Sequence, residues 1–295
     1  MILVVGSTGL VGMEVCRLLS KNNHKFRALV RSTSDPGKVA ELSDLGAEVC
    51  VGDLKQPESL REACSGIKSI ISSASSTLSR QEGDSIATVD EIGQLNLIEA
   101  AGGAGVEKFV FISFKEAGDT DYPLNQTKRK VERALSDSNM NWTSLQSAYF
   151  MEVWLSPALG FDYVNQAARI YGSGENGLSW ISYRDVAKFA VEALSNPIAD
   201  RTILEIGGPE KLSPNEVLKI FERIFGKSFA VERIPIDALK NQKQAASNPL
   251  EESFAGLMIQ YAKGDEIDME SLLEKVQIDL LSVQDYAQTL AKSAL

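Results

Sequence analysis

The sequence predicts an α/β fold, in which a Rossmann-type, doubly wound parallel sheet is joined to a smaller, mostly helical C-terminal part. Over residues 1–146, short runs rich in β-branched and aromatic residues alternate with longer amphipathic stretches. This alternation is typical of βαβ units with right-handed crossovers. Runs such as Ile2–Val5 and Lys108–Ser113 are mostly apolar, as expected for strands that are covered on both faces.

The same alternation orders the elements along the chain. We expect helices over Leu10–Ser20 and Ile92–Ala101, where apolar residues recur at helical spacing. A capping box formed by Ser213 and Glu216, with Pro214 in the first turn, predicts the start of a later helix. The expected strands are Ile2–Val5, Lys25–Val30, Ala47–Val51, Ser69–Ser72, Lys108–Ser113, Trp142–Gln146, Leu178–Ser182 and Thr202–Ile206.

The pattern changes after Leu145, and aromatic residues, glycines and Pro157 interrupt it over residues 151–180. We therefore expect residues 1–150 to form the Rossmann domain, with residues 178–208 returning to it. Residues 151–177 and 209–295 are expected to form the smaller part, which would bind the substrate.

Composition and charge exclude several classes of protein. The 30 basic and 40 acidic residues give a formal net charge of −10, so neither nucleic acid nor a membrane surface is an expected partner. The single histidine, His24, lies in a polar turn, and the three cysteines form no C-x-x-C motif, so we expect no metal site and no Ser-His-Asp triad. Met1–Val5 lacks the basic start of a signal peptide, which favours a cytoplasmic protein, or one in an organelle lumen after removal of a targeting segment.

A glycine-rich turn follows the first expected strand and opens the first expected helix. Gly6 permits the tight turn, Gly9 lets the backbone approach a pyrophosphate, and Gly12 allows the helix to pack closely on the strand. The free N–H groups and the dipole of the helix would hold the phosphates. The alternative is a turn that only connects strand to helix. The residues expected to bind a dinucleotide here are Gly6, Ser7, Thr8, Gly9, Leu10, Val11 and Gly12.

Arg31 and Ser32 follow the second expected strand, where an NAD site would carry Asp or Glu for the ribose 2′-hydroxyl. A guanidinium matches a 2′-phosphate in charge and in bidentate geometry. NADP(H) is therefore favoured over NAD(H), with a solvated arginine as the alternative.

Two further segments follow expected strands at the edge where parallel sheets bind ligands. Asp53 and Leu54 follow the third strand, and the Asp53 carboxylate can accept a hydrogen bond from the adenine amino group; a helix-capping aspartate is the alternative. Ser73 and Ala74 follow the fourth strand, where small residues let the backbone lie against the cofactor.

These motifs together resemble the atypical short-chain dehydrogenases/reductases, and within them the NmrA-like group, which includes isoflavone-reductase-like and quinone-reductase-like proteins. The resemblance also covers Lys128-x-x-Val131-Glu132. It implies that Lys128 reaches the nicotinamide ribose or the substrate, whereas a solvated lysine is the alternative. We expect its replacement by methionine to leave folding nearly intact.

The Tyr-x-x-x-Lys pattern of the main dehydrogenase family is broken, because Tyr122 is followed four positions later by Gln126. This disfavours a nucleotide-sugar epimerase. Ser113 is expected to orient a substrate oxygen, and Tyr122 remains a candidate for proton transfer. Tyr149 and Phe150, just past the sixth strand, would line the nicotinamide pocket, or else be ordinary core aromatics.

The resemblance implies an NADP(H)-dependent oxidoreductase that reduces a small carbonyl, quinone or enone, acting as a monomer or homodimer on an apolar or aromatic substrate. The other class of function left open is a non-catalytic NADP(H)-binding sensor or assembly factor, because a Rossmann site can serve binding alone.

Overall fold

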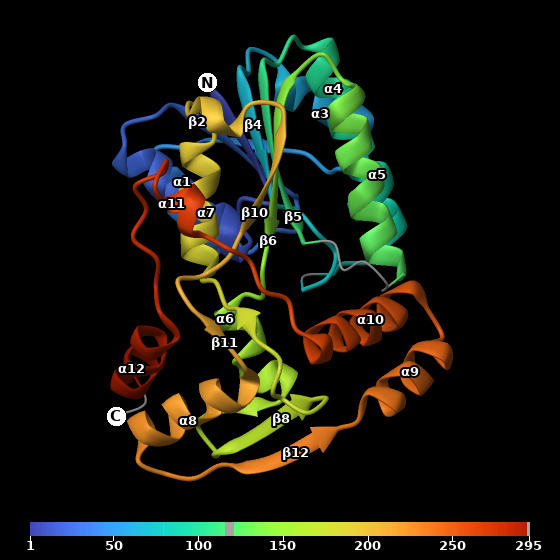
Figure 1. Ribbon diagram of the computed structural model, residues 1–295. Helices are drawn as coiled ribbons and strands as arrows, with labels where there is room; N and C mark the ends of the chain where they lie inside the picture. The colour runs from blue at the N-terminus through green and yellow to red at the C-terminus, as the bar shows by residue number, and fades with distance from the viewer. Residues whose placement is uncertain (79, 116–120, 294–295) are drawn as a thin grey trace. The chain divides into compact units, whose positions relative to one another are not determined.

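The computed structural model describes residues 1–78, 80–115 and 121–293, and Figure 1 traces the chain through them. The chain divides into two compact units. The first holds Met1–Phe114, Pro123–Gln146 and Val186–Leu204, and the second holds Lys115–Tyr122, Ser147–Asp185 and Glu205–Leu295. Neither unit is therefore continuous in sequence.

A seven-stranded sheet forms the centre of the first unit. Its strands are β1 (Ile2–Val5), β2 (Phe26–Val30), β3 (Glu48–Val51), β4 (Ser69–Ser72), β5 (Lys108–Phe114), β6 (Asn141–Ser147) and β10 (Thr202–Ile206). Their order is β10-β6-β5-β4-β1-β2-β3, and β1 pairs in parallel with both β2 and β4. The predicted doubly wound fold is confirmed. The strand order reverses between β1 and β4, and such a switch point is where open α/β sheets bind ligands.

Helices cover both faces of this sheet. They are α1 (Leu10–Lys21), α2 (Pro36–Asp44), α3 (Pro57–Cys64), the π-helix η1 (Ile86–Gly93), α4 (Gln94–Gly103), α5 (Pro123–Asp137), α7 (Tyr183–Glu192), most of which belongs to this unit, and the short η3 (Pro197–Ala199). Figure 1 shows α3, α4 and α5 on one face and α1 on the other. The core between α3–α5 and the sheet includes Ile70, Phe109 and Phe111, which are fully buried. In β1 the successive residues Leu3, Val4 and Val5 are at most 1% exposed, so this apolar strand is covered on both faces, as predicted.

The helical segment predicted from Ile92 begins earlier in the structure. Ser85 accepts a hydrogen bond from the backbone N–H of Thr88, and the Thr88 hydroxyl accepts one from the backbone of Ser85. This reciprocal cap starts η1 at Ile86, and η1 leads directly into α4. The apolar spacing of the sequence identified the second helix and missed the π-helical turns before it.

The second unit combines short strands with helices. The strands are β7 (Phe161–Asp162), β8 (Ala167–Tyr171), β9 (Leu178–Ser179), β11 (Lys211–Leu212) and β12 (Ala230–Ile234). The helices are α6 (Met151–Trp154), η2 (Pro157–Leu159), α8 (Pro214–Phe225), α9 (Ile236–Gln244), α10 (Pro249–Lys263), α11 (Glu270–Leu273) and α12 (Val283–Ser293). β12, β8 and β7 form one sheet, and β9 pairs with β11 in another. The predicted capping box of α8 is confirmed, since Ser213 and Glu216 bond each other's backbone.

The segment expected to be a strand over Leu178–Ser182 differs from the prediction. Only Leu178–Ser179 is a strand, and it pairs antiparallel to β11 outside the seven-stranded sheet. The chain accordingly returns to the first unit at Val186, later than the expected residue 178. Length explains the difference, because two paired residues in a two-stranded ribbon give no sequence period that distinguishes them from a sheet strand.

Candidate cofactor-binding and catalytic site

The glycine turn after β1 is built so closely that glycine is required at two of its positions. Gly6 has a φ of +82°, which L side chains rarely adopt, and its carbonyl accepts a hydrogen bond from the Gly9 N–H at 2.9 Å. A Cβ placed on Gly12 would lie 2.1 Å from the Gly6 carbonyl oxygen, and one on Gly6 would lie 2.8 Å from the Ala74 nitrogen. The turn therefore brings the start of α1 directly against the end of β1.

The N-terminus of α1 fits an anionic ligand. Gly9 is its N-cap and supplies no side-chain hydrogen bond, and the first turn carries no acidic residue. The first N–H groups of a helix have no partner within the helix, and the dipole adds partial positive charge there. Thr8, Leu10 and Val11 continue the turn, with Leu10 exposed and Val11 buried. A phosphate at this position would find donors and no competing carboxylate.

Side chains around the turn divide into structural and cationic groups. The buried Ser7 hydroxyl donates to the Leu29 carbonyl at 2.7 Å, so this side chain ties the turn to β2 and its backbone is what a cofactor could meet. Asp35 caps α2 by accepting from the Lys38 N–H at 2.9 Å. The Lys38 ammonium then donates to the Thr8 carbonyl at 2.8 Å. Sequence reasoning missed this lysine, which adds positive charge beside the glycine turn.

The segment after β4 lies beside the same turn. The Ser73 N–H donates to the Val5 carbonyl at 2.9 Å, and Ala74 lies against Gly6 as described above. The structure thus brings the ends of β1 and β4 together at the switch point. The predicted contact of this backbone with a cofactor stays a prediction.

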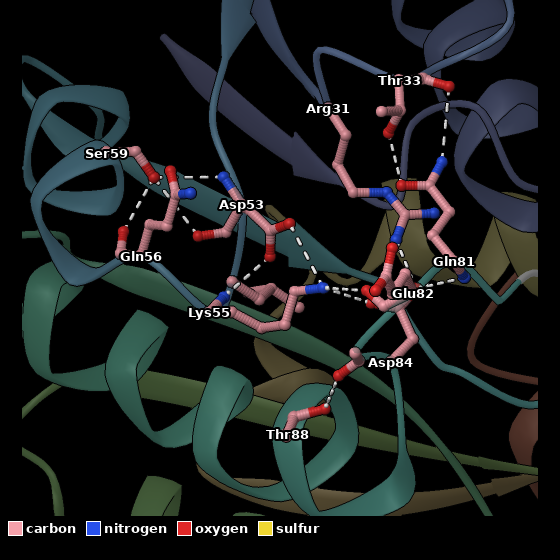
Figure 2. A network of polar contacts seen from close by, with 12 residues as sticks. Arg31, Thr33, Asp53, Lys55, Gln56, Ser59, Gln81, Glu82, Asp84 and Thr88 are labelled. Atoms are coloured by element: carbon pink, nitrogen blue, oxygen red, sulfur yellow. Dashed lines mark hydrogen bonds and ion pairs between the residues drawn. The ribbon is translucent and has the colours of Figure 1, made fainter.

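Arg31 lies at the end of β2, as predicted, and is held in a network that the sequence did not reveal (Figure 2). Its guanidinium Nη1 lies 2.5 Å from Oδ2 of Asp84, and Lys55 Nζ lies 2.6 Å from Oδ1 of the same carboxylate. Ser32, the next residue, is exposed. Arg31 is therefore neither a freely solvated arginine nor a cation without a counter-ion.

Asp53 and Leu54 follow β3 and have separate roles. Oδ1 of Asp53 accepts from the Lys55 N–H at 2.8 Å, and its Oδ2 lies 3.7 Å from the Lys55 ammonium. The N-cap of α3 is Gln56, so the helix-capping alternative for Asp53 is wrong and the carboxylate instead shapes the turn before the helix. Leu54 is buried in the core, so its side chain contributes packing, and only its backbone can face a ligand.

Lys128 is buried within α5, which overturns the interpretation of a solvated lysine. Its ammonium lies 3.8 Å from Oδ1 of Asp90 in η1, 3.4 Å from the Ile112 carbonyl oxygen and 4.7 Å from the centre of the Phe111 ring. Burial lowers the pKa of Lys128, and the Asp90 carboxylate opposes that shift. Oδ2 of Asp90 is held by the Ser76 N–H and hydroxyl at 3.0 and 2.7 Å. Lys128 is therefore a buried cation with a carboxylate beside it, near the end of β5.

Ser113, near the end of β5, is held by Arg129, which follows Lys128 in α5. Arg129 Nη2 donates to the Ser113 hydroxyl oxygen at 3.1 Å and to the Phe114 carbonyl at 2.7 Å. Glu132 pairs with Arg129 at 3.1 Å. Lys130 is half-exposed and pairs with Glu91 at 2.9 Å. The basic run of the sequence therefore splits into one buried lysine, one arginine that positions Ser113, and one surface lysine.

The remaining predicted site residues belong to the second unit. Tyr122 is buried and donates from its hydroxyl to Oε1 of Gln260 at 2.8 Å. Tyr149 packs edge-on against Trp154, with ring centres 4.9 Å apart, and its buried hydroxyl has no hydrogen-bond partner among the described residues. Phe150 precedes α6 and is partly buried. Tyr149 thus belongs to an aromatic core, while the roles of all three toward a cofactor stay predictions.

The part of the chain that the structure describes offers little support for a metal site, a reactive thiol or a membrane span. Within residues 1–78, 80–115 and 121–293, no group of three or more His, Cys, Asp or Glu side chains could hold a metal ion. Cys16 and Cys64 are buried, and burial raises their thiol pKa values to about 12 and about 11, which makes both poor nucleophiles. Over the same residues, no helix is both long and apolar enough to pass through a bilayer.

The sequence of this chain is similar to a known protein family over almost its whole length. The model of the NmrA-like family matches residues 1–287. The chain belongs to the NmrA-like family. Among curated relatives, it is 32% identical over 241 residues to the photosystem II assembly factor Ycf39 of Synechocystis sp., covering 81% of this chain and 72% of that protein. It is 31% identical over 264 residues to an NAD(P)H azoreductase of Xenophilus azovorans, covering 88% and 85%.

A solved structure shares the fold of this NmrA-like chain from end to end. The NADPH-dependent quinone oxidoreductase QOR2 of Escherichia coli, complexed with NADPH, superposes with a TM-score of 0.80 at 21% identity. The match covers 98% of this chain and 99% of the other. At that identity the likeness establishes the fold alone.

Sequence reasoning missed the acidic partners of the site. Asp90 stands beside Glu91, between the apolar residues Val89 and Ile92 of the segment that the structure folds as η1, and a carboxylate on a buried helical face is a signal that it requires a cation. Asp84 gave no comparable signal, because its contact with Arg31 spans 53 positions and runs through a loop.

Proposed function

We propose that this NmrA-like protein is an NADP(H)-dependent oxidoreductase that reduces a small carbonyl, quinone or enone by hydride transfer. The observation that carries the proposal is the uncapped N-terminus of α1 behind the Gly6–Gly12 turn, with Arg31 at the neighbouring strand end. Together they offer donors for a pyrophosphate and a guanidinium for a 2′-phosphate.

In this proposal the protein's own residues would bind the cofactor, orient the substrate and polarise its reacting group. Bound NADPH supplies the hydride, so the chain needs no redox group of its own. Lys128 would hold a ribose hydroxyl or exchange a proton near the end of β5, and Ser113, fixed by Arg129, would orient the substrate oxygen. The smaller unit, with aromatic side chains such as Tyr149, Trp154 and Tyr261, is proposed to recognise an apolar or aromatic substrate.

The names of several relatives support a reductase. One is an NAD(P)H azoreductase, and an isoflavone reductase homolog IRL of Zea mays is 27% identical over 285 residues. The test is steady-state oxidation of NADPH by the purified chain with a panel of quinones, enones and aryl carbonyls. Turnover with at least one class is expected, and tight NADPH binding without turnover on any would count against catalysis.

Replacing Arg31 with alanine is expected to weaken NADPH binding by about 1.5–3 kcal/mol, the range for a hydrogen bond to a charged group. NADH binding should change little, because NADH lacks the 2′-phosphate. Titration calorimetry with both nucleotides measures the difference. Equal affinity of the unaltered protein for NADH and NADPH would remove the NADP preference.

A second candidate function is that of a non-catalytic NADP(H)-binding sensor or assembly factor. Two observations favour it: the broken pattern at Tyr122 and Gln126, and the similarity to relatives named as photosystem II assembly factors. On this proposal the chain binds NADPH with full affinity and reduces nothing. The substrate panel described for the reductase proposal separates the catalytic function from the non-catalytic one. The oligomeric state is a separate question, and sedimentation analysis would decide between the proposed monomer and homodimer.

A further inference from the structure

The Asp84 carboxylate fills the space between the two cations that face it (Figure 2). Its side chain is 1% exposed, whereas those of Arg31 and Lys55 are each 26% exposed. Oδ2 contacts Arg31 at 2.5 Å and also accepts from the Gln81 N–H at 2.9 Å, while Oδ1 contacts Lys55 at 2.6 Å. Although burial acts to raise it, the hydrogen bonds from Lys55 and Arg31 lower the pKa of Asp84. The carboxylate is therefore charged at neutral pH.

Asp84 is fixed in this position by the loop that carries it. The Gln81 side-chain amide donates to the Thr33 carbonyl at 3.3 Å, and the Thr33 hydroxyl donates in return to the Gln81 side chain. Behind Asp84, the Thr88 hydroxyl donates to the Gly83 carbonyl at 2.8 Å. These contacts tie the loop to the end of β2 on one side and to the start of η1 on the other. Asp84 therefore remains beside Arg31 unless several hydrogen bonds break together.

The charges at this point nearly cancel. Arg31 and Lys55 supply two positive charges and Asp84 one negative, and Oδ2 of Asp53 lies 3.7 Å from the Lys55 ammonium. A 2′-phosphate carries up to two negative charges and would share the Arg31 guanidinium with a fixed carboxylate. A ribose 2′-hydroxyl meets no such repulsion and can donate to a carboxylate, as it does to the acidic residue of NAD sites.

We propose that Asp84 is a specificity-determining residue that weakens the NADP(H) preference set by Arg31, because it competes with the 2′-phosphate and offers NADH an acceptor. This inference rests on the proposed function, since it assumes that a dinucleotide occupies the site. It assigns to a loop after β4 a selectivity that Rossmann sites usually place at the end of β2.

The test is the affinity of the full-length chain for NADPH and NADH, measured by titration calorimetry on the unaltered protein and on Asp84→Asn. Asparagine keeps the shape and one acceptor oxygen but removes the charge. We expect NADPH to bind about tenfold more tightly to Asp84→Asn, the effect of deleting one partly screened charge, while NADH binding is unchanged or weaker. The fragments 2′,5′-ADP and 5′-ADP should repeat the pattern, which locates the effect at the 2′-phosphate.

Glu82→Gln is the matched control, because Glu82 is an exposed carboxylate of the same loop. It removes the same formal charge and should change NADPH affinity by less than about twofold, as expected for a solvated charge. Lys55→Met provides an independent arm if Asp84→Asn does not fold. Loss of Lys55 leaves Asp84 less neutralised and should weaken NADPH binding while sparing NADH.

Weaker or unchanged NADPH binding in folded Asp84→Asn would overturn the proposal, since Asp84 would then only position Arg31 for the phosphate. Unchanged NADPH binding in Lys55→Met would also overturn it. If the unaltered protein binds neither nucleotide, the proposed function fails and this inference falls with it. If it binds NADPH and only the Asp84 effect is missing, the proposed function stands.

Discussion

Replacing Lys128 with methionine is expected to lower kcat by about 100-fold or more, the usual consequence of losing a positioned acid, base or orienting group. The Lys128 ammonium lies 3.4 Å from the Ile112 carbonyl, near the carboxyl end of β5, where open α/β sheets place their ligands. Methionine keeps the length and apolar stem but cannot donate or carry charge. The measurement is steady-state NADPH oxidation with whichever substrate the panel identifies.

Lys130→Met is the control, because Lys130 lies on the same helix but is half-exposed and pairs with Glu91. Its kcat should stay within about twofold of the unaltered protein, since exposed ion pairs contribute little. Equal rates in both variants would remove Lys128 from the catalytic site.

The pH dependence of kcat provides a second test of the role of Lys128. Burial lowers the pKa of Lys128, so if the reaction needs the charged ammonium, kcat should fall as pH rises through a value below that of a solvated lysine. The Lys128→Met variant should lose this alkaline limb. A limb of the same position in the variant would assign the titration to another group.

The sheet could be predicted from the sequence because each of its strands carries its own local signal. Ile2–Val5 is apolar throughout and is followed by a glycine turn, and a strand covered on both faces needs no other information. β9 carries no such signal, since two residues paired with Lys211–Leu212 leave no period to detect. The π-helical start of α4 was likewise missed, because apolar spacing is read with an α-helical period.

The candidate site divides in the same way. The glycines of the sequence indicate close backbone contact. Gly12 lies where a Cβ would collide with the Gly6 carbonyl oxygen. Burial of a charged side chain does not follow from local sequence: Lys128 stands between Thr127 and Arg129 in a run of polar residues. Its partner Asp90 is 38 positions away, and only tertiary structure brings the two together. Contacts between residues that are distant in sequence set the chemistry of a site, and they cannot be predicted from local sequence patterns.

Burial of the Lys128–Asp90 pair also revises the expectation that Lys128→Met leaves folding nearly intact. The side chains are 7% and 0% exposed, and removing one partner of a buried ion pair leaves the other charge uncompensated. We expect Lys128→Met to lose about 3 kcal/mol of unfolding free energy, the low end of the usual range, because Ser76 still donates two hydrogen bonds to Asp90. Denaturant unfolding followed by circular dichroism measures the loss.

The double variant Asp90→Asn/Lys128→Met separates stability from catalysis. It removes both charges, so it should recover more than half of the lost stability while kcat remains low. If kcat recovers together with stability, the loss in Lys128→Met reflected unfolding and not chemistry.

The single variant Asp90→Asn is expected to destabilise the protein in a pH-dependent way. Without Asp90, the buried Lys128 loses the carboxylate that opposes its lowered pKa, so the folded state gives up the proton more readily than the unfolded chain. The unfolded state then binds more protons between the two pKa values, and stability must rise with pH across that interval. Unfolding midpoints of Asp90→Asn should therefore increase as the pH rises toward the ordinary lysine pKa, relative to the unaltered protein. A difference between the two proteins that does not vary with pH would mean that Lys128 does not depend on Asp90 for its charge.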